Sequence, residues 1–235
     1  MSLYEKEWQA VKARIAAAAV AAGRDPKDIT LLAVSKTFSA EAVRAVYDLG
    51  QRGFGENYVQ EARAKIEALQ DLAGIEWHAI GPLQSNKARV VAASFSWVHT
   101  VDSLRLAQRL SDARAAHLPP LNVCVQVNVS GEPSKSGVSP DAALALAVAV
   151  APLPRLQLRG FMTIARETSD TALQRQQFGK LAALMAAARA QGLTLDTLSM
   201  GMSADLESAI AEGATLVRVG SAIFGPRSPR AEAAS

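Results

Sequence analysis

This sequence has one cysteine, no long apolar run and no strong excess of one charge. Cys124 lies within the apolar run Leu121–Val127, so an internal disulfide is excluded and the thiol is expected to be a small buried hydrophobe. The longest apolar stretches, such as Ala142–Ala151, are far shorter than the roughly 20 residues of a membrane span. Charged residues occupy positions 5–7, where a signal peptide would be apolar. We therefore expect a soluble, cytoplasmic protein without a membrane partner.

Motifs for several kinds of chemistry are also missing. Net charge is only +3, and basic residues are scattered among acidic ones without a basic cluster interleaved with aromatics. We therefore expect no nucleic-acid partner, although a slight basic excess is compatible with a pocket for a phosphorylated small molecule. Metal-ligand spacing is absent among His78, His99, His117 and Cys124, and no GxSxG, GxGxxG or Walker-type loop is present. We expect no metal.

What the chain does contain is a regular alternation of short apolar runs and longer helical patterns, after an alanine-rich amphipathic helix at about residues 3–22. The predicted strands centre on Leu31–Val34, Arg52–Phe54, Glu76–Ile80, Trp97–His99, Val123–Val127, Leu156–Gly160, Thr197–Leu198 and Leu216–Val219. The predicted helices are Ala40–Leu49, Tyr58–Leu69, Asn86–Ala93, Ser103–Ala115, Pro140–Val150, Thr171–Ala190 and Ala204–Glu212. The predicted N-caps are Ser39, Ser139 and Ser203, and the glycines expected just past helix ends are Gly50, Gly192 and Gly213.

This alternation predicts an α/β fold, because strands separated by helices pair in parallel through right-handed crossovers. Eight strands at about 25 residues per unit match a single (β/α)8 TIM barrel, here with an additional N-terminal helix. An open doubly wound sheet is the alternative. No linker divides the chain, so we expect one domain over residues 1–235, with a flexible tail at 227–235.

Lys36 directly follows the first predicted strand, at the end of the barrel where active sites lie. A lysine amine forms a Schiff base with an aldehyde, and partial burial lowers the pKa of the amine toward the reactive free base. A solvated loop lysine is the alternative interpretation.

Other polar residues also follow predicted strands. Asn57 follows the second strand and lines the expected site, unless it merely caps the next helix. His78 lies in the segment Trp77–Pro82 with which the third strand ends, unless it is a satisfied core histidine. Arg218 shares a strand face with residues 216 and 220, which places it inside the barrel, where a buried cation needs a partner. That partner is a bound ligand or, alternatively, Glu56 or Asp205.

The ends of the last two strands have the composition of a phosphate site, with hydroxyls and closely approaching backbone but no bulky side chains. The residues are Ser199, Gly201, Ser203, Gly220, Ser221 and Gly225. A Schiff-base lysine, an inward arginine and a phosphate cradle together indicate a ligand with both an aldehyde and a phosphate. Pyridoxal 5′-phosphate is such a ligand.

The sequence closely resembles the pyridoxal phosphate homeostasis protein family, also described as proline synthetase co-transcribed proteins, from Ile29 to Arg227. The matching segments are Leu32–Thr37, Phe54–Glu61, Trp77–Lys87, Asn128–Ser130, Ser134–Gly137, Arg159–Met162, Leu198–Ser203 and Val217–Gly225. Two departures are mild: Phe38-Ser39 follows Thr37, where the family often has a basic residue or proline, and Phe161 replaces the usual leucine.

The resemblance implies a fold like the amino-terminal barrel of alanine racemase, of pyridoxal phosphate fold type III, with the cofactor on Lys36 as an internal aldimine. Arg218 then faces the pyridine nitrogen. The residues implied for the phosphate are Ser199, Gly220 and Ser221, and those implied for the ring are Asn57, His78, Met162 and Met200.

The resemblance also implies a carrier that acts in vitamin B6 homeostasis and delivers the cofactor, with apo enzymes as acceptors, instead of an enzyme. Arginine beside the pyridine nitrogen disfavours ring protonation, which weakens the ring as an electron sink. No residue is identifiable as the second acid/base that racemisation needs. A low-activity amino-acid racemase is the alternative. Lys135 is either a second contact for departing cofactor or a solvated lysine, and we expect a monomer or weak dimer.

Overall fold

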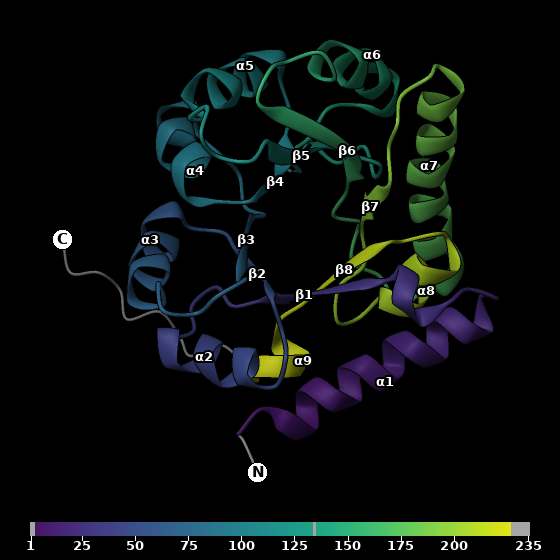
Figure 1. Ribbon diagram of the computed structural model, residues 1–235. Coiled ribbons are helices and arrows are strands. Elements are labelled where there is room, and N and C mark those ends of the chain that lie inside the picture. The colour runs from purple at the N-terminus through teal and green to yellow at the C-terminus, as the bar shows by residue number, and fades with distance from the viewer. Residues whose placement is uncertain (1–2, 134, 227–235) are drawn as a thin grey trace.

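The computed structural model describes residues 3–133 and 135–226. Within them, eight parallel strands close into a barrel in sequence order, and β8 pairs with β1 to complete it (Figure 1). The strands are β1 (Thr30–Val34), β2 (Gly53–Glu56), β3 (Glu76–Ala79), β4 (Trp97–Val101), β5 (Leu121–Gln126), β6 (Leu156–Met162), β7 (Thr197–Ser199) and β8 (Leu216–Val219). The barrel prediction is confirmed, and the open-sheet alternative is wrong. The expected tail at 227–235 lies outside the described residues.

Helices alternate with the strands and surround the barrel (Figure 1). They are α1 (Glu5–Ala21), α2 (Ala40–Asp48), α3 (Val59–Ala68), α4 (Ala88–Ser94), α5 (Leu104–Ala113), α6 (Pro140–Val150), α7 (Thr171–Ala190), α8 (Leu206–Ala211) and α9 (Ser221–Phe224), with 3-10 helices η1 (Pro26–Asp28) and η2 (Ser85–Lys87). The predicted helices are confirmed in position. The sequence pattern does not predict α9, η1 or η2, because three or four residues are too few to show a helical period.

Two of the three predicted N-caps are confirmed. The hydroxyls of Ser39 and Ser139 accept hydrogen bonds from backbone amides in the first turns of α2 and α6. The prediction for Ser203 is wrong, because α8 begins two residues later than expected, after Asp205. Asp205 instead accepts a hydrogen bond from the backbone amide of Met202 at 2.5 Å, which closes a turn ahead of the helix. The three glycines expected past helix ends all have positive φ.

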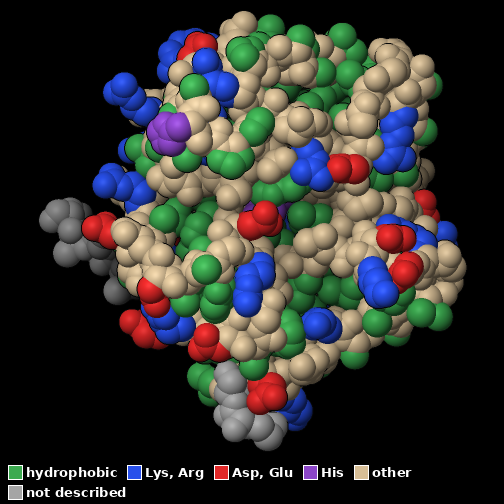
Figure 2. All heavy atoms as spheres, in the orientation of Figure 1, with side chains coloured by type: hydrophobic (Ala, Val, Ile, Leu, Met, Phe, Trp, Pro, Cys, Tyr) green, Lys and Arg blue, Asp and Glu red, His purple; other side chains and the backbone are tan. Residues whose placement is uncertain are grey.

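The first helix lies outside the ring of helices, against α8 and α9 (Figure 1). Its buried residues, Trp8, Val11, Ile15 and Ala19, recur at spacings of three and four and form one apolar face. On the molecular face in Figure 2, basic and acidic side chains are interspersed, and no broad basic area is visible. No helix in the described part of the chain is both long and apolar enough to span a membrane.

Candidate cofactor-binding site

A cavity of about 310 Å³ opens at the carboxyl ends of the strands. It brings together five of the predicted site residues, namely Lys36, Asn57, Arg218, Gly220 and Ser221. The other lining residues are Val34, Ile80, Ile164, Glu167, Thr168, Gln174, Met202, Ser203, Ala204 and Asp205. The loops after β1, β2, β6, β7 and β8 therefore converge on one small-ligand space, within the size range of such sites.

The backbone around Lys36 is held on both sides. Before it, the Ser35 carbonyl accepts a hydrogen bond from Lys65 Nζ at 2.7 Å. After it, the Thr37 amide donates to Glu61 Oε1 at 2.6 Å, and Thr37 has a φ of 70°, which is unusual for a β-branched residue. The turn that presents Lys36 to the cavity is thus fixed by contacts from α3.

Lys65 forms the centre of this buried cluster. It is only 5% exposed, and its Nζ lies 2.7 Å from Glu56 Oε1 and 2.7 Å from Glu61 Oε1. Ser35 Oγ donates to Glu56 Oε1 at 2.6 Å. Burial raises the pKa of Glu56, an effect that Lys65 opposes. Lys65 is not among the residues predicted for the site, although its spacing from the buried Ala62 places it on the apolar face of α3.

Arg218 occupies the barrel interior, as predicted, and is 4% exposed. Its Nη1 donates to Ser199 Oγ at 2.8 Å, and its Nη2 donates to the Thr163 carbonyl at 2.7 Å. Burial lowers the pKa of Arg218 to about 10, so it remains a cation at neutral pH. Among the described residues no carboxylate forms an ion pair with it, so the salt-bridge alternative with Glu56 or Asp205 is not realised.

Ser199 and His78 lie deeper than expected. Ser199 is fully buried, and its hydroxyl contacts His99 Nδ1 at 2.8 Å as well as Arg218. His99 Nε2 in turn lies 2.9 Å from His78 Nδ1. Burial lowers the pKa of His78 to about 3 and that of His99 well below its ordinary value, so both rings are neutral at pH 7. His78 is in the middle of β3 and borders a different cavity, so the structure does not place it at the cofactor ring.

The remaining predicted residues divide into two groups. Ser221 lines the cavity, with its hydroxyl 3.4 Å from that of Ser203, and Gly220 lies beside them. A Cβ at Gly220 would approach the Val34 carbonyl to 3.0 Å, so the glycine permits close strand packing. Met162 and Met200 are fully buried and are not among the lining side chains.

The structure also places two further loop residues, Asn57 and Lys135. Asn57 does not cap α3, because the N-cap position is Tyr58 and no side chain bonds to the cap. Lys135 does not line the cavity; its Nζ donates to the Ala165 carbonyl at 2.6 Å and lies 3.2 Å from Glu132 Oε2. Its described contacts therefore belong to a structural ion pair at the edge of the barrel.

The cavity includes two carboxylates that are not among the predicted site residues, Glu167 and Asp205. Glu167 is exposed, whereas Asp205 is 8% exposed and burial raises its pKa. The loop after β6 and the turn before α8 supply them. Neither carboxylate follows its strand directly, so the position of a strand end does not predict them.

Comparison with known proteins identifies the family. The alanine racemase N-terminal domain family matches residues 8–228. The pyridoxal phosphate homeostasis protein of Pseudomonas aeruginosa is 56% identical over 227 residues, which are 97% of this chain and 97% of that protein. This chain belongs to the pyridoxal phosphate homeostasis protein family. The family member of Escherichia coli is 53% identical over 219 residues, covering 92% of this chain and 94% of that one.

Solved structures agree with this family assignment. PipY of Synechococcus elongatus, solved with pyridoxal phosphate bound, has a TM-score of 0.79 and 41% identity, covering 90% of this chain and all of PipY. The alanine racemase of Clostridium difficile has a TM-score of 0.71 at 15% identity and shares the fold alone, covering 86% of this chain and 54% of the racemase. The predicted resemblance to the family and to the racemase barrel is thus confirmed.

Proposed function

We propose that this protein binds pyridoxal phosphate in the carboxyl-end cavity, covalently on Lys36, and serves to hold and deliver the cofactor. The observation that carries the proposal is the presence of Lys36, Arg218 and Ser221 in one small cavity. Two curated relatives with over half of their residues identical are named for pyridoxal phosphate homeostasis, and PipY was solved with the cofactor bound. The cofactor, when bound, supplies an aldehyde for an amine and a ring that withdraws electrons.

The residues present fit this group. Arg218 is a buried cation that lines the cavity without an ion-pairing carboxylate in the described chain, so an electronegative atom of a ligand compensates its burial. We assign it to the pyridine nitrogen. At that place its fixed positive charge disfavours protonation of the pyridine nitrogen. An unprotonated ring is a weaker electron sink, so it stabilises a carbanion of an attached amino acid less well.

The hydroxyls of Ser203 and Ser221 fit the phosphate. They lie 3.4 Å apart, and Gly220, which lines the same cavity, has no side chain of its own to hinder an anion. This assignment replaces Ser199, whose buried hydroxyl is already engaged by Arg218 and His99. Ser199 is then a positioning residue for Arg218.

Lys36 is assigned as the covalent anchor. Its amine would condense with the aldehyde carbon, forming a C=N bond with loss of one water molecule. The contacts of Ser35 and Thr37 with α3 fix the turn and so limit the conformations open to the lysine. Asn57, on the loop after the neighbouring strand β2, would contact the ring or its hydroxyl group.

Carrier function is favoured over racemisation because, within residues 3–133 and 135–226, no tyrosine lines the cavity as a partner for Lys36. The Tyr47 hydroxyl donates to the Ala73 carbonyl, and Tyr4 packs against Phe224. A low-activity racemase is the second candidate, since Asp205 and Glu167 are cavity carboxylates able to carry a proton. Apo enzymes that use the cofactor are the proposed acceptors.

An absorption titration tests binding. Adding pyridoxal phosphate to the purified protein should produce a saturable band near ~420 nm, the region expected for such imines. Lys36→Ala should abolish the band, whereas Lys135→Ala, which alters a lysine outside the cavity, should keep it. A band that persists in Lys36→Ala would reject Lys36 as the anchor.

A further inference from the structure

A row of four hydrogen-bonded polar side chains crosses the barrel interior. They are Arg218 on β8, Ser199 on β7, His99 on β4 and His78 on β3. The donor–acceptor distances along the row are 2.8, 2.8 and 2.9 Å, and the exposed fractions of the four residues lie between 0% and 4%. Because an unpaired polar group at this depth is costly, the position of each proton along the row is restricted.

The direction of these hydrogen bonds follows from Arg218. A guanidinium group can only donate, so Ser199 Oγ accepts from it. In residues 3–133 and 135–226 the Ser199 proton then has one acceptor, Nδ1 of His99. Burial lowers the pKa of both histidines, so each ring carries a single proton at neutral pH. The His99 proton is therefore on Nε2, which donates to Nδ1 of His78.

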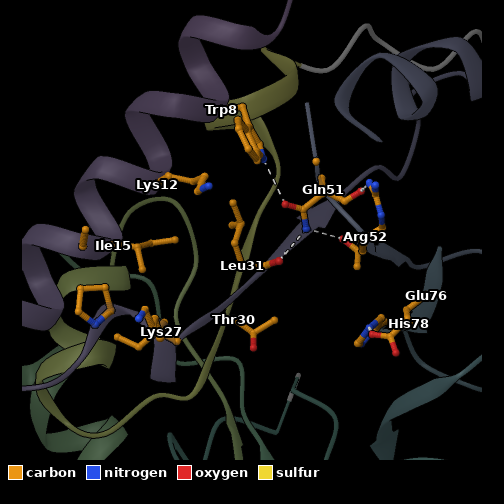
Figure 3. Close-up of a pocket in the computed structure, with 15 residues that line it drawn as sticks. Trp8, Lys12, Ile15, Lys27, Thr30, Leu31, Gln51, Arg52, Glu76 and His78 are labelled. Atoms are coloured by element: carbon orange, nitrogen blue, oxygen red, sulfur yellow. Dashed lines mark hydrogen bonds and ion pairs between the residues drawn. The ribbon is translucent and has the colours of Figure 1, made fainter. Parts of the chain in front are cut away.

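The reversed arrangement is less favourable. With a proton on His99 Nδ1, Ser199 would accept from both neighbours, and its own proton would have no acceptor among the described residues. The reversal would also leave a lone pair on His78 Nε2, which has no hydrogen bond to a described residue. Figure 3 shows Glu76 beside His78, and its Oε2 lies 3.9 Å from this nitrogen. A carboxylate repels a lone pair and attracts an N–H, so Glu76 favours the direction that Arg218 imposes.

This direction holds the guanidinium group of Arg218 at two points. Ser199, with its proton directed to His99, presents a lone pair to Nη1. The Thr163 carbonyl accepts from Nη2 at 2.7 Å. Two anchored NH₂ groups determine the plane of the guanidinium group. Because Arg218 lines the cavity of Lys36, its remaining N–H groups are donors with a fixed orientation for a ligand there.

We propose that His99 is a positioning residue for the bound ring: by accepting the Ser199 proton it keeps Ser199 an acceptor for Arg218, and so directs a guanidinium N–H to the pyridine nitrogen. The inference rests on the proposed function, which assigns Arg218 to that nitrogen. The cavity then selects aldehydes whose ring has an unprotonated acceptor at this place, because a fixed donor pairs with a lone pair and not with a C–H. His99 thus contributes to specificity although it does not line the cavity.

The first test uses the wild-type chain without cofactor. NMR of the ¹⁵N-labelled histidine rings at neutral pH should show His99 protonated on Nε2 and unprotonated on Nδ1. A proton on Nδ1 of His99 would overturn the proposal, because Ser199 would then have no acceptor that directs its hydroxyl group away from Arg218. This measurement does not depend on the folding of any variant.

The second test compares pyridoxal phosphate with 1-deazapyridoxal phosphate, in which a C–H replaces the ring nitrogen. In absorption titrations, wild type should bind the pyridine compound at least about tenfold more tightly. His99→Leu removes the acceptor and should reduce this preference at least about threefold. His99→Asn can place an amide oxygen near the position of Nδ1 and should retain the preference. His117→Leu, which changes an exposed histidine, is the matched control.

A double-substitution cycle separates positioning from a general loss of stability. Because His99 acts through Ser199, His99→Leu should not change the preference further in the Ser199→Ala background, where it is already reduced. A histidine that only stabilised the fold would affect both affinities equally. A wild-type preference in His99→Leu, a further reduction in the double variant, or equal binding of the two aldehydes by wild type would each overturn the proposal. Failure of wild type to bind either aldehyde would instead refute the proposed function, and this inference with it.

Discussion

Lys65 Nζ donates a hydrogen bond across 2.7 Å to the carbonyl of Ser35, the residue that precedes Lys36. The same ammonium group lies 2.7 Å from Glu56 Oε1, so one buried cation connects α3, β2 and the turn after β1. The position of Lys36 therefore depends on a charge cluster that does not itself touch the cavity.

Replacement of Lys65 tests this dependence. Lys65→Met should destabilise the fold by about 3–5 kcal/mol, because it leaves the buried Glu56 without its partner. Lys65→Met/Glu56→Leu should recover most of that loss, since no buried charge remains unpaired. Urea unfolding measures both. A single variant that loses less than about 1 kcal/mol would mean that the cluster contributes little.

The phosphate assignment predicts a selective loss. Ser203→Ala/Ser221→Ala should weaken binding of pyridoxal phosphate at least about tenfold, because charge-assisted hydrogen bonds contribute about 1.5–3 kcal/mol each. Binding of pyridoxal, which lacks the phosphate, should be weak and unchanged by the substitution. Ser94→Ala, on the outer helix α4, is the matched control. Parallel losses for both ligands would place the phosphate elsewhere.

The sequence predicted the barrel because its apolar β-branched runs and its caps agree with one another along the chain. The sequence also predicted that Arg218 points into the barrel, because successive side chains of a strand lie on opposite faces. His78 illustrates the limit of that argument. Alternation shows which face of the sheet a side chain occupies, but it does not show how far along the barrel axis the side chain lies. Ile80, just past the end of β3, lines the cavity, whereas His78, two residues earlier on the same face, does not.

The Lys65 cluster and the cavity carboxylates show a second limit. Lys65 has the spacing of a core residue on α3, but its burial is stabilised by the carbonyl of Ser35, which is distant in sequence. Asp205 lies in a turn that an Asp-to-backbone hydrogen bond closes, whereas the sequence favoured Ser203 as a helix cap. Contacts between residues of different segments determine the burial of Lys65 and the position of Asp205. Helical or strand periodicity does not predict such contacts.

Burial of His78 predicts a specific pH dependence of stability. Its pKa falls from about 6.5 to about 3 on folding, so the unfolded chain binds the proton more tightly, and this stability is present above pH 6.5 and lost as pH falls below it. From pH 7.5 to 5.5 the loss from His78 should be about 1.4 kcal/mol.

The neighbouring His99 shifts in the same direction, and Glu76 and Arg218 also contribute to the field at these rings. His78→Phe should therefore remove only part of the acid sensitivity, about the 1.4 kcal/mol assigned to His78. Urea unfolding of wild type and variant at both pH values gives the difference. Identical pH dependence of the two proteins would show that His78 is not buried in its neutral form.

The carrier proposal predicts little amino-acid turnover. Exchange of the Cα hydrogen of L- and D-alanine for deuterium should stay near the rate with free pyridoxal phosphate, because loss of one acid/base partner typically costs ~10²–10⁴ in rate. Exchange with inversion at about 1 s⁻¹ or faster would instead support the racemase. In that case Asp205→Asn and Glu167→Gln would identify which cavity carboxylate carries the proton.

The central claim, that the protein holds pyridoxal phosphate on Lys36, is tested most directly by borohydride reduction of the loaded protein followed by peptide mapping. Reduction converts the C=N bond into a stable amine at the lysine that carries the cofactor. We expect the mass increment of the reduced cofactor on Lys36 and its absence in Lys36→Ala. An increment on Lys65, Lys135 or any other lysine, with Lys36 unmodified, would contradict it.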